Sequence, residues 1–129
     1  MKAVISVQFV VEVHDAILKE TGVGRAGVDR AKLEGILGRV DHQTHYNDVQ
    51  DIFEIAAWYG IAIAKGHGFV DANKRTGLAV MLTYLELQGV TIRHHTGLDD
   101  MMVSLVESQI DHESLSVQVA DYLFGLMAD

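Results

Sequence analysis

The sequence predicts an all-α fold, a compact single-domain bundle of about six helices. Hydrophobic residues make up 49% of the 129 residues, and most of them recur at the three- and four-residue spacing of a helix. The chain contains no proline, so no predicted helix is interrupted by one. A chain of this length fits one domain, and we expect residues 1–129 to form it.

The first two helices are marked by the residues at their ends. Ser6 is a suitable N-cap for the first helix, and Gly22 is a suitable stop. A loop rich in glycine is expected over residues 22–27, after which Asp29 can cap a second helix. The apolar residues of this second helix follow helical spacing as far as Val40.

A buried helix is predicted in the middle of the chain. Residues 41–47 are polar and without core periodicity, so we expect a mobile connection there. Residues 48–65 carry apolar side chains on nearly every face, which is typical of a central helix. Gly66 stands where its stop is expected.

Three more helices are predicted in the second half. Asp99 and Ser114 are suitable caps for the last two, and the β-branched segment 90–95 is compatible with an extended conformation. The predicted helical ranges are 73–88, 98–110 and 114–127.

Composition excludes several classes of protein. The chain has no cysteine, which rules out disulfides and thiolate metal sites. Its net charge of −8 opposes direct binding to nucleic acid. No long apolar stretch without charges predicts a membrane span, and Glu12 interrupts the apolar N-terminal run early. We interpret that run as the first helix, with a signal peptide as the alternative, and we expect a cytoplasmic protein.

The segment "HGFVDANKRTG", from His67 to Gly77, concentrates functional groups between two apolar helices. The first turn of the second helix exposes free backbone N–H groups and a partial positive charge, which favours phosphate. Lys74 and Arg75 add full charges, and the Asn73 amide can donate a hydrogen bond. Lys65 lies nearby in the sequence and adds a further cation to this local group.

The remaining residues of the segment supply the other parts of a transfer site. Asp71 precedes the helix, and a carboxylate beside phosphates is the usual ligand for Mg²⁺. His67 can act as a general base at neutral pH. We expect Phe69 to point into the core and anchor the loop, so that His67 and Asp71 face outward. Base, metal ligand and anion cradle are the parts of a phosphoryl or nucleotidyl transfer site.

Each of these residues also has an ordinary structural explanation. An Asp or Asn before a helix is usually a cap, and Lys or Arg in a first turn is usually solvated. A lone loop histidine is more often structural than catalytic. The order of the residues in the segment is more informative than any one of them.

That order resembles the core motif of the Fic/Doc family, in the form HxFxDANKRT of the Doc (death-on-curing) branch. Ala72 and Lys74 stand where Fic proteins have glycine, and Leu78 stands where they often have a further arginine. One departure is Gly68, which we expect to loosen the loop. The matching residues are His67, Phe69, Asp71, Asn73, Lys74 and Arg75.

The resemblance implies a helical domain that is the toxin of a toxin–antitoxin pair, encoded by a bacterium, phage or plasmid. It implies transfer of the γ-phosphate of ATP to a Thr or Ser hydroxyl of a translation factor, elongation factor Tu or one like it. His67 would deprotonate that hydroxyl, Asp71 would hold Mg²⁺, and Phe69 would anchor the loop. Nucleotide phosphates would be bound by Asn73, Lys74 and Arg75.

The resemblance also implies partners and alternatives. The chain lacks the inhibitory pattern [ST]xxxE[GN] of many Fic proteins, so we expect inhibition in trans by an antitoxin that binds as a helix in a groove. Residues 41–47 occupy the place of the family's target-aligning flap. Two alternatives stay open, namely a Fic-type AMP-transferase and a non-catalytic helical binding module.

Two further histidine patterns lie outside the segment. His42 and His45 are spaced so that a helix could turn both to one face, as in zinc sites, but no third ligand supports them. His14 and Asp15 match the first two letters of a phosphohydrolase pattern whose other members cannot be traced. We expect His14 to pack structurally.

Overall fold

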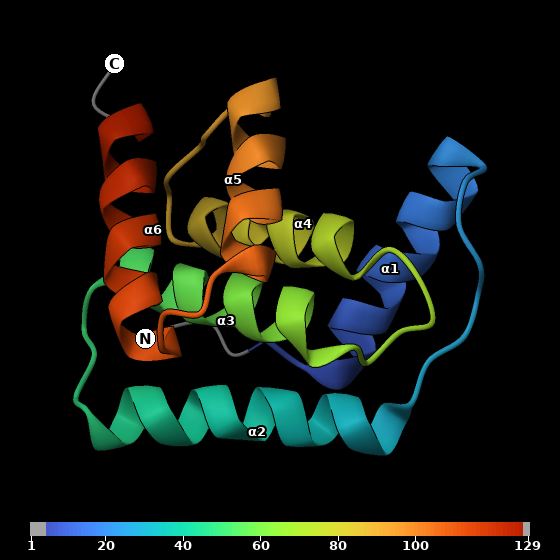
Figure 1. Ribbon diagram of the computed structural model, residues 1–129, viewed down its shortest axis with the longest axis horizontal. Coiled ribbons are helices and arrows are strands. Elements are labelled where there is room, and N and C mark those ends of the chain that lie inside the picture. The colour runs from blue at the N-terminus through green and yellow to red at the C-terminus, as the bar shows by residue number, and fades with distance from the viewer. Residues whose placement is uncertain (1–4, 128–129) are drawn as a thin grey trace.

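The computed structural model describes residues 5–127, and within them it is all-α, with six helices and no strand (Figure 1). The predicted fold class is therefore confirmed. None of these helices combines the length and apolar character needed to cross a membrane, among the residues described. The helices are α1 (Val7–Thr21), α2 (Arg30–Tyr46), α3 (Ile52–Gly66), α4 (Asn73–Leu87), α5 (Thr96–Glu107) and α6 (His112–Met127).

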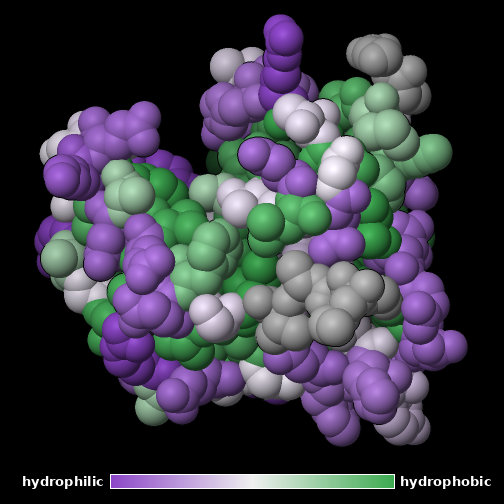
Figure 2. All heavy atoms as spheres, turned by 180° about the vertical axis from the view of Figure 1, so that it is seen from behind, coloured by the Kyte–Doolittle hydropathy of each residue, from purple (hydrophilic) through white to green (hydrophobic). Residues whose placement is uncertain are grey.

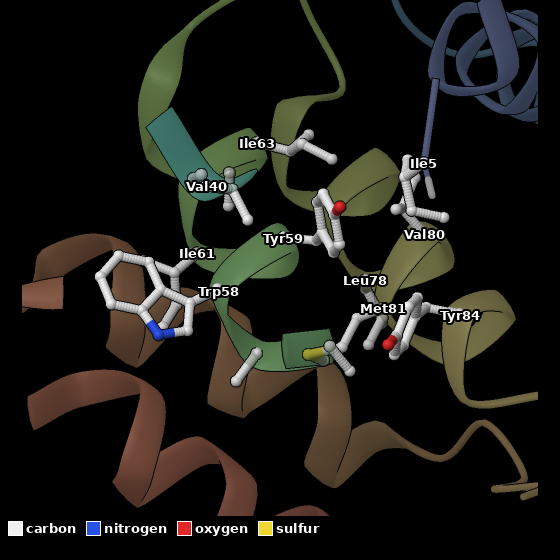
Figure 3. Packing of buried hydrophobic residues seen from close by; sticks show 14 of the residues in the cluster. Ile5, Val40, Trp58, Tyr59, Ile61, Ile63, Leu78, Val80, Met81 and Tyr84 are labelled. Atoms are coloured by element: carbon white, nitrogen blue, oxygen red, sulfur yellow. The ribbon is translucent and has the colours of Figure 1, made fainter. Parts of the chain in front are cut away.

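α3 lies at the centre of the bundle. Ten consecutive residues, Ile55–Ala64, are buried, as the apolar character of every face predicts. α4 packs along α3 most extensively, and α2 and α6 flank it (Figure 1). Around Tyr59, the core closes through side chains of α3 and α4, where the Tyr59 and Tyr84 rings lie 5.8 Å apart (Figure 3).

Small residues allow α3 and α4 to approach closely. A Cβ atom added to Gly77 would lie 2.7 Å from the Gly60 carbonyl oxygen and 3.2 Å from the Ala64 backbone nitrogen. Only glycine fits at this contact, because backbone atoms cannot move aside as a flexible side chain can. The contact lies one turn into α4, so it fixes where α4 begins relative to the end of α3.

The predicted caps of the first two helices are confirmed. The Ser6 hydroxyl accepts from the Phe9 amide at 3.0 Å, and Gly22 ends α1 in the left-handed region at φ 66°. The Asp29 carboxylate accepts from the Lys32 amide at 3.0 Å.

The caps predicted for the last two helices are wrong. α5 begins at Thr96 with His95 as its N-cap, not at Asp99. The carboxylate of Asp111 accepts from the Ser114 amide at 2.9 Å, so the cap of α6 precedes Ser114. Both helices start two residues earlier than predicted, because the residues before their first buried leucines, Leu98 and Leu115, are polar or small and carry no apolar signal.

Residues 41–47 are not a mobile connection, and this prediction is also wrong. α2 continues to Tyr46, and Asn47 is its C-cap. Half-buried Thr44 continues the buried stripe one turn beyond Val40, and its hydroxyl donates to the Val40 carbonyl at 2.8 Å. A polar sequence is compatible with a helix here because the rest of this turn faces solvent.

The segment between α2 and α3 extends four residues further than predicted, because α3 does not begin at residue 48. Asp48 adopts φ 50°, and α3 begins at Ile52 after Asp51, whose carboxylate accepts from the Phe53 amide at 2.7 Å. Residues 90–95 join α4 to α5 without regular structure.

Hydrophilic residues cover most of the outline of the molecule in the rear view (Figure 2). Figure 2 shows the rear face, where hydrophobic atoms reach the surface between hydrophilic borders. Large apolar side chains are also exposed singly, such as Val23, Tyr46 and Val70. Scattered exposure of this kind is normal for folded proteins.

The close approach of α3 and α4 gives a stability prediction. Gly77→Ala places a methyl group against the Gly60 carbonyl, so we expect a loss of about 1–3 kcal/mol in the free energy of unfolding. Gly38→Ala in α2 is the matched control, since nothing lies within 4 Å of its added Cβ. We expect the control to gain about 0.5–1 kcal/mol from helix propensity. Urea unfolding measures both, and equal stability of the two variants would contradict the close contact.

Candidate active site

Residues 67–72, here called the motif loop, connect α3 to α4 and contain two strained residues. His67 caps the end of α3 at φ 55°, and Ala72 precedes α4 at φ 66°. Left-handed conformations are unfavourable for residues other than glycine, and they persist where surrounding structure imposes them. Six residues are therefore enough to reverse the chain between two packed helices.

The Asn73 side chain holds the motif loop closed. Its Oδ1 atom accepts from the Phe69 amide at 3.1 Å, and its Nδ2 atom donates to the Phe69 carbonyl at 3.0 Å. This side chain was expected to bind phosphate. In the structure its amide clamps the loop, so the phosphate contact expected of Asn73 would come from its backbone N–H at the start of α4.

Residues 22–29 lie beside the motif loop and pair with it. The Asp29 amide donates to the Gly68 carbonyl at 2.8 Å, and the Val70 amide donates to the Gly27 carbonyl at 3.0 Å. Gly68 was expected to loosen the loop, but its backbone is held by this pairing. A Cβ added to Gly68 would make only ordinary contacts with the side chains of Leu33 and Ile36, so space does not require glycine there.

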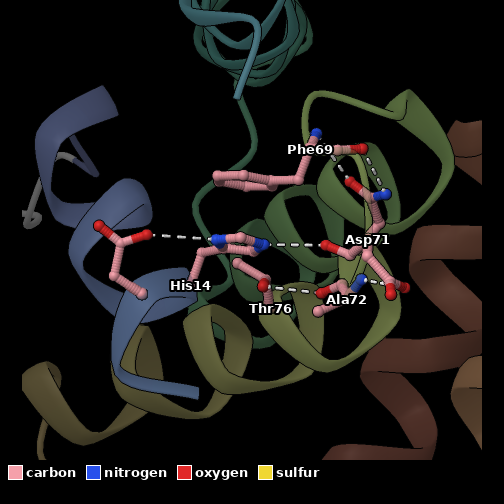
Figure 4. Close-up of polar contacts among 7 residues, drawn as sticks. His14, Phe69, Asp71, Ala72 and Thr76 are labelled. Atoms are coloured by element: carbon pink, nitrogen blue, oxygen red, sulfur yellow. Dashed lines mark hydrogen bonds and ion pairs between the residues drawn. The ribbon is translucent and has the colours of Figure 1, made fainter. Parts of the chain in front are cut away.

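Phe69 points into the interior, as expected of a loop anchor. Its side chain is buried, and its ring stacks on His14 of α1 with centroids 3.9 Å apart and an interplanar angle of 5° (Figure 4). His14 is itself 1% exposed, which agrees with the structural role expected for it. The two rings join the motif loop to α1.

The Asp71 carboxylate is held by two backbone amides. Oδ1 accepts from the Ala72 amide at 2.8 Å, and Oδ2 accepts from the Arg25 amide at 3.2 Å. These hydrogen bonds, the one from Ala72 first, lower the pKa of Asp71 below its ordinary value of 3.8. The carboxylate is therefore ionised at neutral pH and fixed in direction.

Arg75 is positioned by the end of α1. Its Nη1 atom donates to the Thr21 hydroxyl and, with Nη2, to the Val23 carbonyl, each at 3.3 Å. A Cβ added to Gly24 would lie 3.0 Å from the Arg75 Nη2 atom and 2.7 Å from a Leu18 methyl carbon. Gly24 also adopts φ 112°, so glycine is needed to bring this loop so close to the guanidinium.

One cavity of about 380 Å³ brings the polar candidates together, and we call it the motif cavity. It includes the start of α4, where no side chain caps the first amides. A second cavity of about 300 Å³ shares Lys74 and Arg75 with it. The motif cavity is lined by His67, Asp71, Asn73, Lys74 and Arg75, together with small apolar residues and Val106 of α5.

Lys65 does not join this group of cations, which corrects the expectation from its sequence position. Its Nζ atom donates to the carbonyls of Leu105, Val106 and Ser108, at 3.1, 3.4 and 2.7 Å. These carbonyls lie at the end of α5, where a cation is favourable. The side chain lines a separate cavity of about 500 Å³ between α2, α3 and α6, and not the motif cavity.

Two other sequence expectations are placed elsewhere by the structure. The end of α2, proposed as the flap, lies at the opposite side of the molecule from the motif loop (Figure 1), and residues 22–29 take the position beside that loop. His42 stacks near Tyr46 on α2. Within residues 5–127, no group of three or more His, Asp or Glu side chains could hold a metal ion by itself.

Sequence reasoning missed two features of the site. One is the contact of residues 22–29 with Asp71 and Arg75, for which the sequence offers only the three glycines of that segment, a sign of a turn and not of its partner. The other is the hydrogen bond from His14 to the motif loop, for which the sequence gives no local sign.

Comparison with known proteins matches the sequence of this chain to one family. The model described as Fic/DOC family matches residues 4–85, more than half of the chain. The chain is also 36% identical over 113 residues to "Protein kinase doc" of Escherichia phage P1. That alignment covers 87% of this chain and 89% of the phage protein.

The environment of Asp71 predicts a dependence of stability on pH. Its pKa is lower in the folded protein than the unfolded value of 3.8, so its contribution is present above pH 3.8 and is lost as the pH falls through the folded pKa. We expect wild type to lose more stability than Asp71→Asn between pH 5 and the folded pKa. Urea midpoints measured across this range test it.

Asp100→Asn is the control, because Asp100 is an exposed carboxylate of α5. If Asp71→Asn and Asp100→Asn follow the same pH dependence, the backbone amides do not stabilise ionised Asp71.

Proposed function

The chain belongs to the Fic/Doc family, and we propose that it is a Doc-type toxin that phosphorylates a protein of the translation apparatus. In this proposal the γ-phosphate of ATP passes to a Thr or Ser hydroxyl of a factor such as elongation factor Tu. The observation that carries the proposal is the motif cavity, which places an imidazole, an ionised carboxylate and a cationic helix start around one space. The name of the phage relative, a protein kinase, supports the same chemistry.

The start of α4 is the proposed phosphate site. Its first amides have no side-chain cap, so they are available to phosphate oxygens, and the helix end adds partial positive charge. Lys74 is exposed and lines the cavity, and Arg75 contributes a guanidinium already oriented by Val23. These groups would bind the triphosphate and stabilise charge on the transferred phosphoryl group.

His67 is the proposed general base. It is exposed, lies at the edge of the motif cavity and is turned there by its left-handed conformation. It would accept the proton of the target hydroxyl as that oxygen attacks the γ-phosphorus. The new oxygen–phosphorus bond forms while the bond from the γ-phosphorus to the bridging oxygen breaks, and ADP leaves with the bonding electrons.

Asp71 is the proposed Mg²⁺ ligand, and its environment fits that role. Each carboxylate oxygen accepts one hydrogen bond from a backbone amide and retains a lone pair for a metal ion. Because the pKa of Asp71 is lowered, protons do not compete with the metal ion for the carboxylate at neutral pH. Mg²⁺ is commonly bound by one or two carboxylates together with substrate phosphates, so a single aspartate is enough. When bound with ATP, the ion would neutralise part of the phosphate charge.

Two features support transfer of the γ-phosphate over transfer of AMP. Ala72 and Lys74 occupy positions where AMP-transferring relatives carry glycine, and the Lys74 side chain fills space beside the cavity. The second cavity continues from Lys74 and Arg75 to the apolar residues Leu78 and Met102. It offers apolar surface for a nucleoside away from His67, which would leave the terminal phosphate near the imidazole.

The proposal includes a partner and a location. A toxin of this kind requires inhibition, which we assign to an antitoxin supplied in trans as a helix. We assign the activity to the cytoplasm, where the translation factor is found.

Replacing the proposed base gives the first test. His67→Ala should reduce phosphate transfer by about 10²- to 10⁴-fold, because the hydroxyl loses its proton acceptor. The unfolding midpoint should stay near that of wild type, since His67 is exposed. His45→Ala is the control, an exposed histidine at the far end of α2, and should retain full activity. Growth arrest that survives His67→Ala would instead favour a non-catalytic binding module.

The identity of the transferred group gives the second test. Purified protein is incubated with elongation factor Tu and ATP labelled at either the α- or the γ-phosphate. We expect label on the factor only from γ-labelled ATP. Label from α-labelled ATP would establish AMP transfer and contradict the kinase proposal.

A further inference from the structure

His14 is a buried polar residue that the proposed reaction does not use. It lies on α1, 57 residues before Asp71 in the sequence, and is 1% exposed. Its Nε2 atom is 2.8 Å from the Asp71 carbonyl oxygen, and its ring stacks on Phe69 (Figure 4). A buried polar side chain is stabilised by its hydrogen bonds, and this one joins α1 to the motif loop.

The direction of that hydrogen bond is fixed by chemistry. A carbonyl oxygen only accepts, so Nε2 carries the proton and donates it. The other ring nitrogen, Nδ1, is 3.4 Å from the Asp15 carboxylate on the outer side of α1. Both ring nitrogens are therefore occupied away from the motif cavity, and His14 is neither a metal ligand nor a base.

The carbonyl that His14 binds is not used by α4. The first hydrogen bond of the helix runs from the Thr76 amide to the Ala72 carbonyl at 3.0 Å, one residue later. The left-handed Ala72 turns the Asp71 carbonyl out of the helix, toward α1. His14 thus supplies a donor where the helix does not.

The same peptide group also directs the Asp71 carboxylate. The Asp71 carbonyl and the Ala72 amide belong to one planar unit. His14 holds the oxygen end of this unit, and its N–H end donates to the Asp71 Oδ1 atom at 2.8 Å. Because the unit is rigid, a rotation that breaks one hydrogen bond also displaces the other.

We propose that His14 is a positioning residue that orients the Asp71 carboxylate for Mg²⁺ through the peptide group between Asp71 and Ala72. This inference rests on the proposed function, in which Asp71 holds the ion. Partners of this kind behind a metal ligand typically change metal affinity or activity by about 10- to 100-fold when removed.

Two variants separate the hydrogen bond from the packing. His14→Gln keeps an amide donor at the reach of Nε2 but loses the ring, whereas His14→Phe keeps the stacked ring and loses the donor. Binding of Mn²⁺, as the probe for Mg²⁺, is measured by electron paramagnetic resonance in the presence of ATP. We expect His14→Phe to weaken Mn²⁺ binding by about 10- to 100-fold and His14→Gln to stay within about threefold of wild type.

The opposite pattern overturns the proposal. If His14→Phe binds Mn²⁺ as wild type does, or if His14→Gln loses as much affinity as His14→Phe, the hydrogen bond does not position the carboxylate. Circular dichroism and unfolding midpoints establish that both variants are folded.

A second measurement, by NMR, uses the wild-type protein without nucleotide, so it does not depend on whether a His14 variant folds. Long-range proton–nitrogen NMR spectra of wild type should show His14 protonated at Nε2, with slow exchange of the Ala72 amide. An unprotonated Nε2 overturns the proposal. Wild type that fails to bind Mn²⁺ with ATP overturns the proposed function, and the NMR result then still decides whether His14 holds the peptide group.

Discussion

The close contact of α3 with α4 is the constraint on which the site depends. Because Gly77 meets the Gly60 backbone, α4 must begin close to the end of α3, and the chain has only six residues in which to reverse. Such a short reversal places His67 and Ala72 in the left-handed region. It also leaves the first amides of α4 without a cap and facing a cavity. The anion-binding end of α4 is therefore a consequence of helix packing.

The strain of the motif loop is offset by hydrogen bonds from three directions. A residue other than glycine in the left-handed region costs about 1–2 kcal/mol, so His67 and Ala72 each destabilise the folded motif loop by about that amount. An intramolecular hydrogen bond contributes about 0.5–1.5 kcal/mol, and the loop receives five from Asn73, from residues 27–29 and from His14. These contributions are of the same order as the strain, so the hydrogen bonds can hold the loop in its left-handed turns before any ligand binds.

The sequence predicted the features that depend on local signals. The helical spacing of apolar residues, the Ser6 and Asp29 caps and the buried helix before the motif are all found in the structure. The motif places five polar residues at one helix junction, and the structure puts them around one cavity. The helix signals and the motif are both local, so they do not depend on which distant segments of the chain contact each other.

Features that depend on distant contacts could not be predicted in this way. Lys65 is close to Lys74 in the sequence, but its side chain leaves α3 toward α5, where three carbonyls hold it. Polar residues 41–46 remain helical with only half-buried Thr44 turned toward the rest of the molecule, because α2 is docked by the buried residues before them. The pairing of residues 22–29 with the motif loop joins segments about forty residues apart, a relation that no local pattern encodes.

Asp71 and Arg75 are opposite charges in one cavity, yet the described residues form no ion pair between them. Backbone amides hold the carboxylate, and the Val23 carbonyl with the Thr21 hydroxyl holds the guanidinium. Neither charge therefore has to break a salt bridge before it binds a ligand. A carboxylate free to meet a cation, beside a guanidinium with N–H groups left for an anion, suits a ligand that brings both, as a metal–nucleotide complex does. The segments that hold the two charges, α1 and residues 22–29, thus shape the site as much as the motif itself.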